Sequence, residues 1–267
     1  MFNSKSEADV VVIKINGCIY ASEDKKNNGI TPEKFQEALN EFDLDKAELI
    51  IIDINSGGGS PVGSSMIHDM ILELRKDVEV IAHCRDICAS GAYMIASACD
   101  RIYAHRSSLI GSIGVIMSGF GLDQFIEKHN IEYREFTAGE NKGFLSPFKP
   151  VSSHRQEEIQ ELLNECHKEF IDMVYNARKV SKQSIKLMED NKDEIVTAKV
   201  FSGANAYIVG LIDGFKNPQE IISEFTNKSN PKVLSAKMKE GFWKRLFSMN
   251  VNVNMDDLMT LENRLKF

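Results

Sequence analysis

The feature that most constrains the fold is a continuous apolar segment, Leu49 to Ile54, which only Asp53 interrupts. A strand with apolar side chains on both faces needs cover on both sides of its sheet, and this is typical of parallel sheets. The segment ends at Asn55-Ser56-Gly57-Gly58-Gly59, and apolar residues at helical spacing resume from about Pro61. The sequence therefore predicts a buried strand, a tight turn and a helix in succession.

Strand and helix patterns alternate along most of the remaining chain. Further strands are expected at 10–15, 78–83, 101–104, 111–116 and 132–136. Further helices are expected from Thr31-Pro32, within 86–98, and at 122–129, 152–178, from about 181, before 210 and at 218–225. This alternation predicts an α/β fold with right-handed crossovers. Residues 137–150, with two glycines and two prolines, form the longest irregular connection, and such loops often carry function.

Composition limits the class of protein. The 267 residues are 43% hydrophobic, which suits a globular chain with a sizeable core. A net charge of −7 argues against nucleic acid as a partner, because phosphate binding needs a concentrated basic face. The five cysteines are an odd number in apolar surroundings, so buried free thiols in a reducing compartment are expected. Cys84 and Cys88 near His83 lack a second ligand pair, so no metal site is expected.

Ser90 is the first candidate for chemistry. Ala89-Ser90-Gly91-Ala92 opens an apolar helix, so small neighbours leave the hydroxyl accessible and the helix N-terminus offers N–H groups to a developing oxyanion. The commoner use of a serine at this position is a plain N-cap.

A serine nucleophile needs a base, and two kinds remain open. Histidines 68, 83, 105, 129, 154 and 167 could form a triad, although none has a recognisable local setting. Lys142, in the loop of residues 137–150, could instead accept the proton, since a desolvated lysine loses its charge more readily. A solvated loop lysine is the alternative.

Taken together, the motifs resemble the signal peptide peptidase A family, also called the protease IV family, and particularly its short SohB-like members. The matching segments occur in the family's order between about residues 10 and 225. They are Ile54-Asn55-Ser56-Gly57-Gly58-Gly59, Ala89-Ser90-Gly91-Ala92-Tyr93, Gly111-Ser112-Ile113-Gly114-Val115, Ala138-Gly139-Glu140-Asn141-Lys142, and Phe201-Ser202-Gly203 with Gly210-Leu211-Ile212-Asp213.

The resemblance implies a fold and a mechanism. The fold is that of the Clp protease/crotonase superfamily, with repeated ββα units, a parallel sheet and C-terminal helices. The family's nucleophile falls on Ser90 and its general base on Lys142, with oxyanion donors at Gly58 and Gly91. Ser112 matches a serine that hydrogen-bonds the lysine.

The resemblance also implies partners. Family members form homo-oligomeric rings in which one subunit's lysine completes a neighbour's site. They cleave signal peptides or other short hydrophobic segments, without metal or cofactor.

Two other functions remain open for the same fold. A crotonase-like enzyme would bind acyl-CoA and stabilise an enolate with paired backbone amides, but it would need an acidic residue near Gly58 or Gly91, and none is apparent. A non-catalytic assembly or scaffold protein would not need both Ser90 and Lys142.

The chain is expected to divide into a peptidase domain at 1–226, with a helical oligomerisation segment at 152–190, and a tail at 227–267. The tail holds a basic amphipathic patch, Trp243 to Phe247, which could contact a membrane surface peripherally. Packing on its own or a neighbouring subunit is favoured. No apolar run reaches the ~20 residues of a membrane span, so a cytoplasmic location is expected, with the inner face of the membrane as the peripheral alternative.

Overall fold

The computed structural model describes residues 5–23, 29–139 and 142–237, and its centre is a seven-stranded sheet. The strand order is β6-β5-β3-β2-β1-β7, and β4 pairs with β3 outside this path. All pairs are parallel except β5 with β6. The strands are β1 Val10–Asn16, β2 Leu49–Ser56, β3 Glu79–Ala89, β4 Arg101–Ala104, β5 Leu109–Gly111, β6 Val200–Ser202 and β7 Val233–Lys237. The predicted α/β fold with a mainly parallel sheet is confirmed.

Strand β2 is buried on both faces, as its composition predicts. Ile50, Ile52 and Ile54 face a large core that includes side chains of α1 (Pro32–Asn40), α2 (Pro61–Leu74) and α3 (Gly91–Ser97). Leu49 and Ile51 point to the opposite face, where α9 (Pro218–Phe225) contributes Ile221. Each fully buried isoleucine contributes roughly 1.5–3 kcal/mol of transfer free energy, so this two-sided cover holds the sheet in place.

Side-chain caps begin several of the helices. The remaining helices in the described residues are α4 Asp123–Lys128, α5 Ser153–Arg178, α6 Lys182–Asp190, α7 Lys192–Ile195 and α8 Gly203–Ile208, with a 3-10 turn at Leu44–Lys46. The Thr31 side chain accepts from the Lys34 N–H at α1, and Ser152 caps α5 in the same way. These side chains satisfy N–H groups that would otherwise lack partners.

Several strand boundaries differ from the sequence predictions. Strand β3 continues to Ala89 instead of ending at residue 83, because its second half gains a new partner, β5. The expected strand at 111–116 is instead β5, which ends at Gly111, and no strand forms at 132–136. Residues 233–237, which were expected in the tail, form β7 beside β1. Residues 238–267, which include the Trp243 to Phe247 patch, lie outside the described part of the chain.

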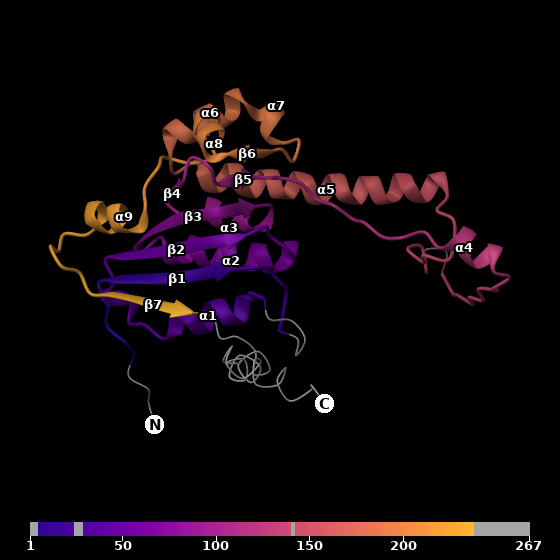
Figure 1. The fold of residues 1–267 in the computed structure, drawn as a ribbon, viewed down its shortest axis with the longest axis horizontal. Helices are drawn as coiled ribbons and strands as arrows, with labels where there is room; N and C mark the ends of the chain where they lie inside the picture. The colour runs from indigo at the N-terminus through magenta and orange to yellow at the C-terminus, as the bar shows by residue number, and fades with distance from the viewer. Residues whose placement is uncertain (1–4, 24–28, 140–141, 238–267) are drawn as a thin grey trace, which may run out of the picture.

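The segment between β5 and α5 extends away from the sheet. This arm, residues 114–139 and 142–152, carries α4 and runs beside the long helix α5 to the end farthest from the sheet (Figure 1). In the described ranges, no helix is long and apolar enough to cross a membrane.

A buried ion pair fastens α5 to the rest of the molecule. Arg178, at the end of α5, is fully buried and donates from Nη2 to Asp213 Oδ1 at 2.8 Å. Asp213 also accepts from the Ser184 hydroxyl at 2.6 Å and from the Ile102 N–H at 2.7 Å. Burial alone would raise the pKa of Asp213, but Arg178 and these two donors hold that pKa below its ordinary value of 3.8.

Replacing Asp213 with Asn should destabilise the fold strongly. The amide keeps the shape of the side chain but leaves Arg178 buried without a counter-ion, so the free energy of unfolding at neutral pH should fall by about 3–5 kcal/mol. The pKa of Asp213 is lower in the folded chain than in the unfolded chain. Its stabilising contribution is therefore complete above the unfolded value and is lost as pH falls through the folded value.

Denaturant unfolding at neutral pH and below pH 3.8 measures both effects. Wild type should lose more stability on acidification than Asp213→Asn. Asp77→Asn, at an exposed position, is the matched control and should change stability by less than about 0.5 kcal/mol. Equal acid sensitivity of wild type and Asp213→Asn would contradict this account.

Candidate active site

Ser90 occupies the turn between the end of β3 and the start of α3. Its φ of 54° and ψ of −128° lie where non-glycine residues are rare. The Ser90 N–H donates to the Gly111 carbonyl at 2.8 Å, and the Ser90 carbonyl accepts from the Tyr93 and Met94 N–H groups at 2.9 and 3.1 Å. The side chain makes no capping hydrogen bond, so Ser90 does not act as a plain N-cap. Strain of about 1–3 kcal/mol at such a residue is a frequent mark of a functional position.

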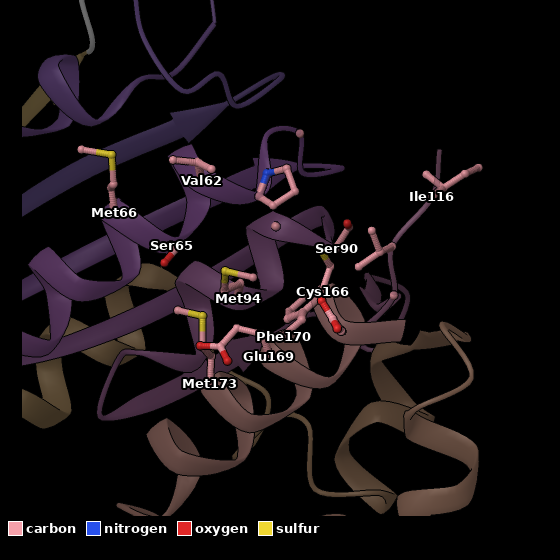
Figure 2. Close-up of a pocket in the computed structure, with 16 residues that line it drawn as sticks. Val62, Ser65, Met66, Ser90, Met94, Ile116, Cys166, Glu169, Phe170 and Met173 are labelled. Atoms are coloured by element: carbon pink, nitrogen blue, oxygen red, sulfur yellow. The ribbon is translucent and has the colours of Figure 1, made fainter. Parts of the chain in front are cut away.

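The Ser90 turn lies against a cavity of about 490 Å³ (Figure 2). Helices α2, α3 and α5 supply most of its walls. The large apolar side chains of these walls are Val62, Met66, Met94, Phe170 and Met173. A partly exposed hydroxyl therefore lies beside an apolar hollow that can hold a side chain of a bound molecule.

The glycine turn after β2 reaches the same cavity. The Gly58 N–H donates to Ser56 Oγ at 3.1 Å, and Gly58 is not among the described residues that line the cavity. Gly59 does line it, and the N–H groups of Gly59 and Gly91 have no hydrogen-bond acceptor within the described residues. The structure thus brings Gly91 beside Ser90 and presents the amide of Gly59, whereas that of Gly58 is already bonded. The run Gly57-Gly58-Gly59 does not by itself reveal which of its backbone N–H groups is left without an acceptor.

Ser112 lies near the Ser90 turn, because it follows Gly111, which bonds to Ser90. Gly111, whose carbonyl binds the Ser90 N–H, has a φ of 100°, and Ser112 follows with a φ of 53°. The Ser112 N–H donates to the Lys199 carbonyl at 2.9 Å. Ser112 is half-buried, and it is not one of the described residues that line the cavity.

Within one chain, the candidate bases do not line the Ser90 cavity. Lys142 is exposed and belongs to the arm, and neither it nor any of the six histidines is among the described residues that line this cavity. His167 instead bonds the Ile113 carbonyl at 2.9 Å, and His83 bonds Asp53 at 2.8 Å. Within the described residues, a single chain therefore places Ser90 and unbonded N–H groups at the cavity, but neither Lys142 nor a histidine.

Two acidic residues that were not identified from the sequence line the cavity. Glu165 and Glu169, one turn apart on α5, both line it. Because α5 begins more than 60 residues after Ser90 in the chain, only the packing of α5 against α3 reveals that they share a site. Their presence supplies the acidic residues that were not apparent near Gly91.

Three of the five cysteines are buried in the structure and two are exposed. Cys84, Cys88 and Cys99 are buried free thiols, and burial raises the pKa of Cys88 and Cys99. Cys18 and Cys166 are exposed, contrary to the expectation that all five are buried. Across residues 5–23, 29–139 and 142–237, no group of three or more potential ligands could hold a metal ion.

The chain resembles solved structures in fold. The 1510-N membrane-bound stomatin-specific protease, solved as a mutant with a substrate peptide, superposes with a TM-score of 0.54 and 15% sequence identity. The superposition covers 91% of this chain and 98% of that one. At this identity the match concerns the fold alone, and it agrees with the Clp-like architecture.

Sequence comparisons identify the family. The chain is 36% identical over 213 residues to the Na(+)/H(+) antiporter NhaA of Brucella abortus, covering 78% of this chain but 28% of that protein. The chain therefore spans little more than a quarter of that relative. A putative protease of Methanocaldococcus jannaschii is 28% identical over 235 residues, covering 84% of this chain and 72% of that protein. The profile of Peptidase family S49 matches residues 73–232, more than half of the chain, and the chain belongs to this family.

Proposed function

We propose that this chain is a serine endopeptidase in which Ser90 is the nucleophile and Lys142 the general base. The observation that carries the proposal is the strained Ser90 turn, which leaves the hydroxyl without a capping role beside an apolar cavity. Membership of a peptidase family supports hydrolysis of peptide bonds. The apolar cavity wall supports short hydrophobic segments, such as remnants of signal peptides, as substrates.

The reaction is acyl transfer to Ser90 followed by hydrolysis. The neutral Lys142 amine takes the proton of the Ser90 hydroxyl as the oxygen attacks the peptide carbonyl, and the tetrahedral intermediate carries its charge on the carbonyl oxygen. Collapse breaks the C–N bond, and Lys142 returns the proton to the leaving amine. Water, deprotonated by the same lysine, then attacks the acyl carbonyl. The ester C–O bond breaks, Lys142 returns the proton to the Ser90 oxygen, and the acyl group leaves as a carboxylic acid.

The oxyanion is proposed to bind the N–H groups of Gly91 and Gly59. Both groups lack an acceptor within the described residues, and both glycines line the Ser90 cavity. Gly58 is replaced in this role because its N–H already donates to Ser56 Oγ. Fixed donors of this kind stabilise the transition state without any reorganisation during the reaction.

Lys142 is proposed to act on the Ser90 of a neighbouring copy. The arm that carries it exposes Ile116, Phe120 and Phe136 at 85%, 87% and 95% of their surface. Such a concentration of exposed apolar side chains marks an interaction surface. Covering the arm with a second copy also removes water around the lysine, which favours the neutral amine that accepts a proton. The family resemblance supports the same arrangement, and Ser112 is proposed to hydrogen-bond the lysine there.

The acyl-CoA alternative gains one observation, since Glu165 and Glu169 supply acidic residues in the cavity. It gives no role to the strained Ser90 hydroxyl, and the family of the chain is a peptidase family. Loss of activity on removing that hydroxyl therefore separates the two functions, and it also separates the peptidase from a non-catalytic scaffold.

Ser90→Ala and Lys142→Ala should each reduce hydrolysis of a hydrophobic fluorogenic peptide by about 10³-fold or more, because each removes a reacting group. If the lysine acts between subunits, a refolded 1:1 mixture of the two variants should regain about a quarter of wild-type activity, since one chain supplies the serine and another the lysine. Peptide turnover by each variant and by the mixture measures this.

Lys128→Ala, at another exposed lysine of the arm, is the matched control and should remain active. Wild-type rates in Ser90→Ala would refute the peptidase assignment. Two inactive variants whose co-assembled mixture stays inactive would place Lys142 in the site of its own chain.

Gly91→Ala should impair the oxyanion donors. A Cβ at Gly91 would lie 2.2 Å from Ser64 Oγ and 3.0 Å from Ser64 Cβ, and Ser64 is fully buried on α2. The turn must therefore shift and misdirect the Gly91 N–H, so kcat should fall by about 10²-fold. Steady-state kinetics should show a smaller change in KM.

Adding Ser64→Gly to Gly91→Ala removes both clashing atoms and should restore part of the lost kcat. Gly119→Ala, where an added Cβ meets no atom within 4 Å, serves as the control. Full activity of Gly91→Ala would show that this close contact does not position the donor.

Phe136→Ser should weaken assembly and activity together. Phe136 is 95% exposed in one copy, so the polar replacement costs the isolated chain little but removes apolar area from the proposed interface. As the Phe136→Ser protein is diluted, its sedimentation coefficient and its peptide turnover rate per chain should fall in parallel. Ile208→Ser, at a 63% exposed residue of α8 outside the arm, should leave both unchanged. Full activity from a Phe136→Ser monomer would contradict the role of the arm.

A further inference from the structure

The cavity beside Ser90 carries two carboxylates on one wall. Glu165 and Glu169 project from successive turns of α5, and both side chains are exposed. Figure 2 shows Glu169 beside Met173, near Phe170 and Met94. An apolar hollow is thus edged by two negative charges on the side opposite α2.

Glu165 and Glu169 have no charged partner in the described part of the chain, although Glu158 on the same helix has one. Glu158, also on α5, pairs with Arg155 at 2.7 Å. Within the described residues, neither Glu165 nor Glu169 makes a hydrogen bond or ion pair, and no Lys, Arg or His lines the cavity. Carboxylates four residues apart on a helix repel each other, so their placement destabilises α5 slightly, and no ion pair in the described part of the chain offsets this.

The chemistry of the cavity suits an amphipathic cationic side chain. Lysine and arginine have an aliphatic stem that packs on apolar surface and a charged head that seeks carboxylates. Methionines such as Met66, Met94 and Met173 adapt their flexible side chains to irregular stems. A purely aliphatic residue would leave Glu165 and Glu169 facing apolar surface, whereas a cation would pair with them.

Resting on the proposed peptidase function, we propose that the enzyme selects peptides with a lysine or arginine close to the cleaved bond. The stem of that residue lies on the methionine wall, and its cation pairs with Glu165 and Glu169. Glu169 and Glu165 are therefore specificity-determining residues, distinct from the groups that make and break bonds. The substrate class becomes basic-apolar segments instead of uniformly hydrophobic ones.

The test compares three internally quenched peptide series that differ at one position. Lysine, the uncharged and similarly shaped norleucine, and glutamate are placed in turn at each of three positions on either side of the cleaved bond, in an otherwise apolar peptide. In wild type, kcat/KM for lysine should exceed that for norleucine by about three- to tenfold at one position or more. This ratio should shrink as salt is added, because exposed charge pairs are screened.

The ratio within each variant separates selectivity from general damage. The double variant Glu165→Gln/Glu169→Gln should bring the lysine-to-norleucine ratio of kcat/KM near one. The single variant Glu169→Lys should cleave the glutamate peptide in preference to the other two. Asp172→Asn, which removes one negative charge at an exposed position of α5 outside the cavity lining, should keep the wild-type ratio. A wild-type ratio near one at every position, or a ratio unchanged in the double variant, would overturn the inference. Failure of wild type to cleave even the norleucine peptides would instead count against the proposed peptidase function.

Discussion

The site depends on one steric constraint: two turns at the carboxyl edge of the sheet approach more closely than side chains allow. A Cβ at Gly58 would lie 2.7 Å from the Gly91 nitrogen, and one at Gly59 would lie 2.1 Å from the Ile19 carbonyl oxygen. Glycine alone lets the backbone after β2 reach the backbone after β3. That approach places two N–H groups beside Ser90, whose positive φ is held by the Gly111 carbonyl. The arrangement of the candidate site therefore follows from how β2, β3 and β5 end.

The cavity wall depends on a second, distant interaction. Helix α5 supplies Phe170, Met173 and the two glutamates, yet most of its length has few buried side chains. Its last turn is held by Arg178, which is buried with Asp213 in a network that also includes the Ile102 amide of β4. Under the proposed specificity, an ion pair at the end of the helix sets the position of the wall that carries Glu165 and Glu169. The exposed remainder of α5 would then present charged residues to the substrate.

Sequence patterns predicted the parts of the fold that local chemistry determines. The two-sided apolar run of β2, the Thr31 cap of α1 and the Ser152 cap of α5 each act within a few residues. Strand ends were less predictable, because a partner decides them: β3 runs to Ala89 where β5 joins it, and β7 forms where β1 offers an edge. At the candidate site, the motif predicted Ser90 and Gly91, and both line the same cavity in the structure. The available amide of Gly59 and the presence of Glu165 depend on backbone direction and helix packing, which no local pattern records.

The separation of Ser90 from Lys142 has a consequence for when the proposed enzyme is active. A lone chain places Ser90 and the N–H groups of Gly59 and Gly91 at the cavity, but Lys142 is exposed on the arm and is not among the described residues that line that cavity. In the proposed mechanism, a lone copy therefore lacks the lysine at the Ser90 cavity. Association would supply both position and desolvation in one step. The rate of peptide hydrolysis would then rise more steeply than in proportion to protein concentration until assembly is complete. Newly made, unassembled chains would therefore hydrolyse little.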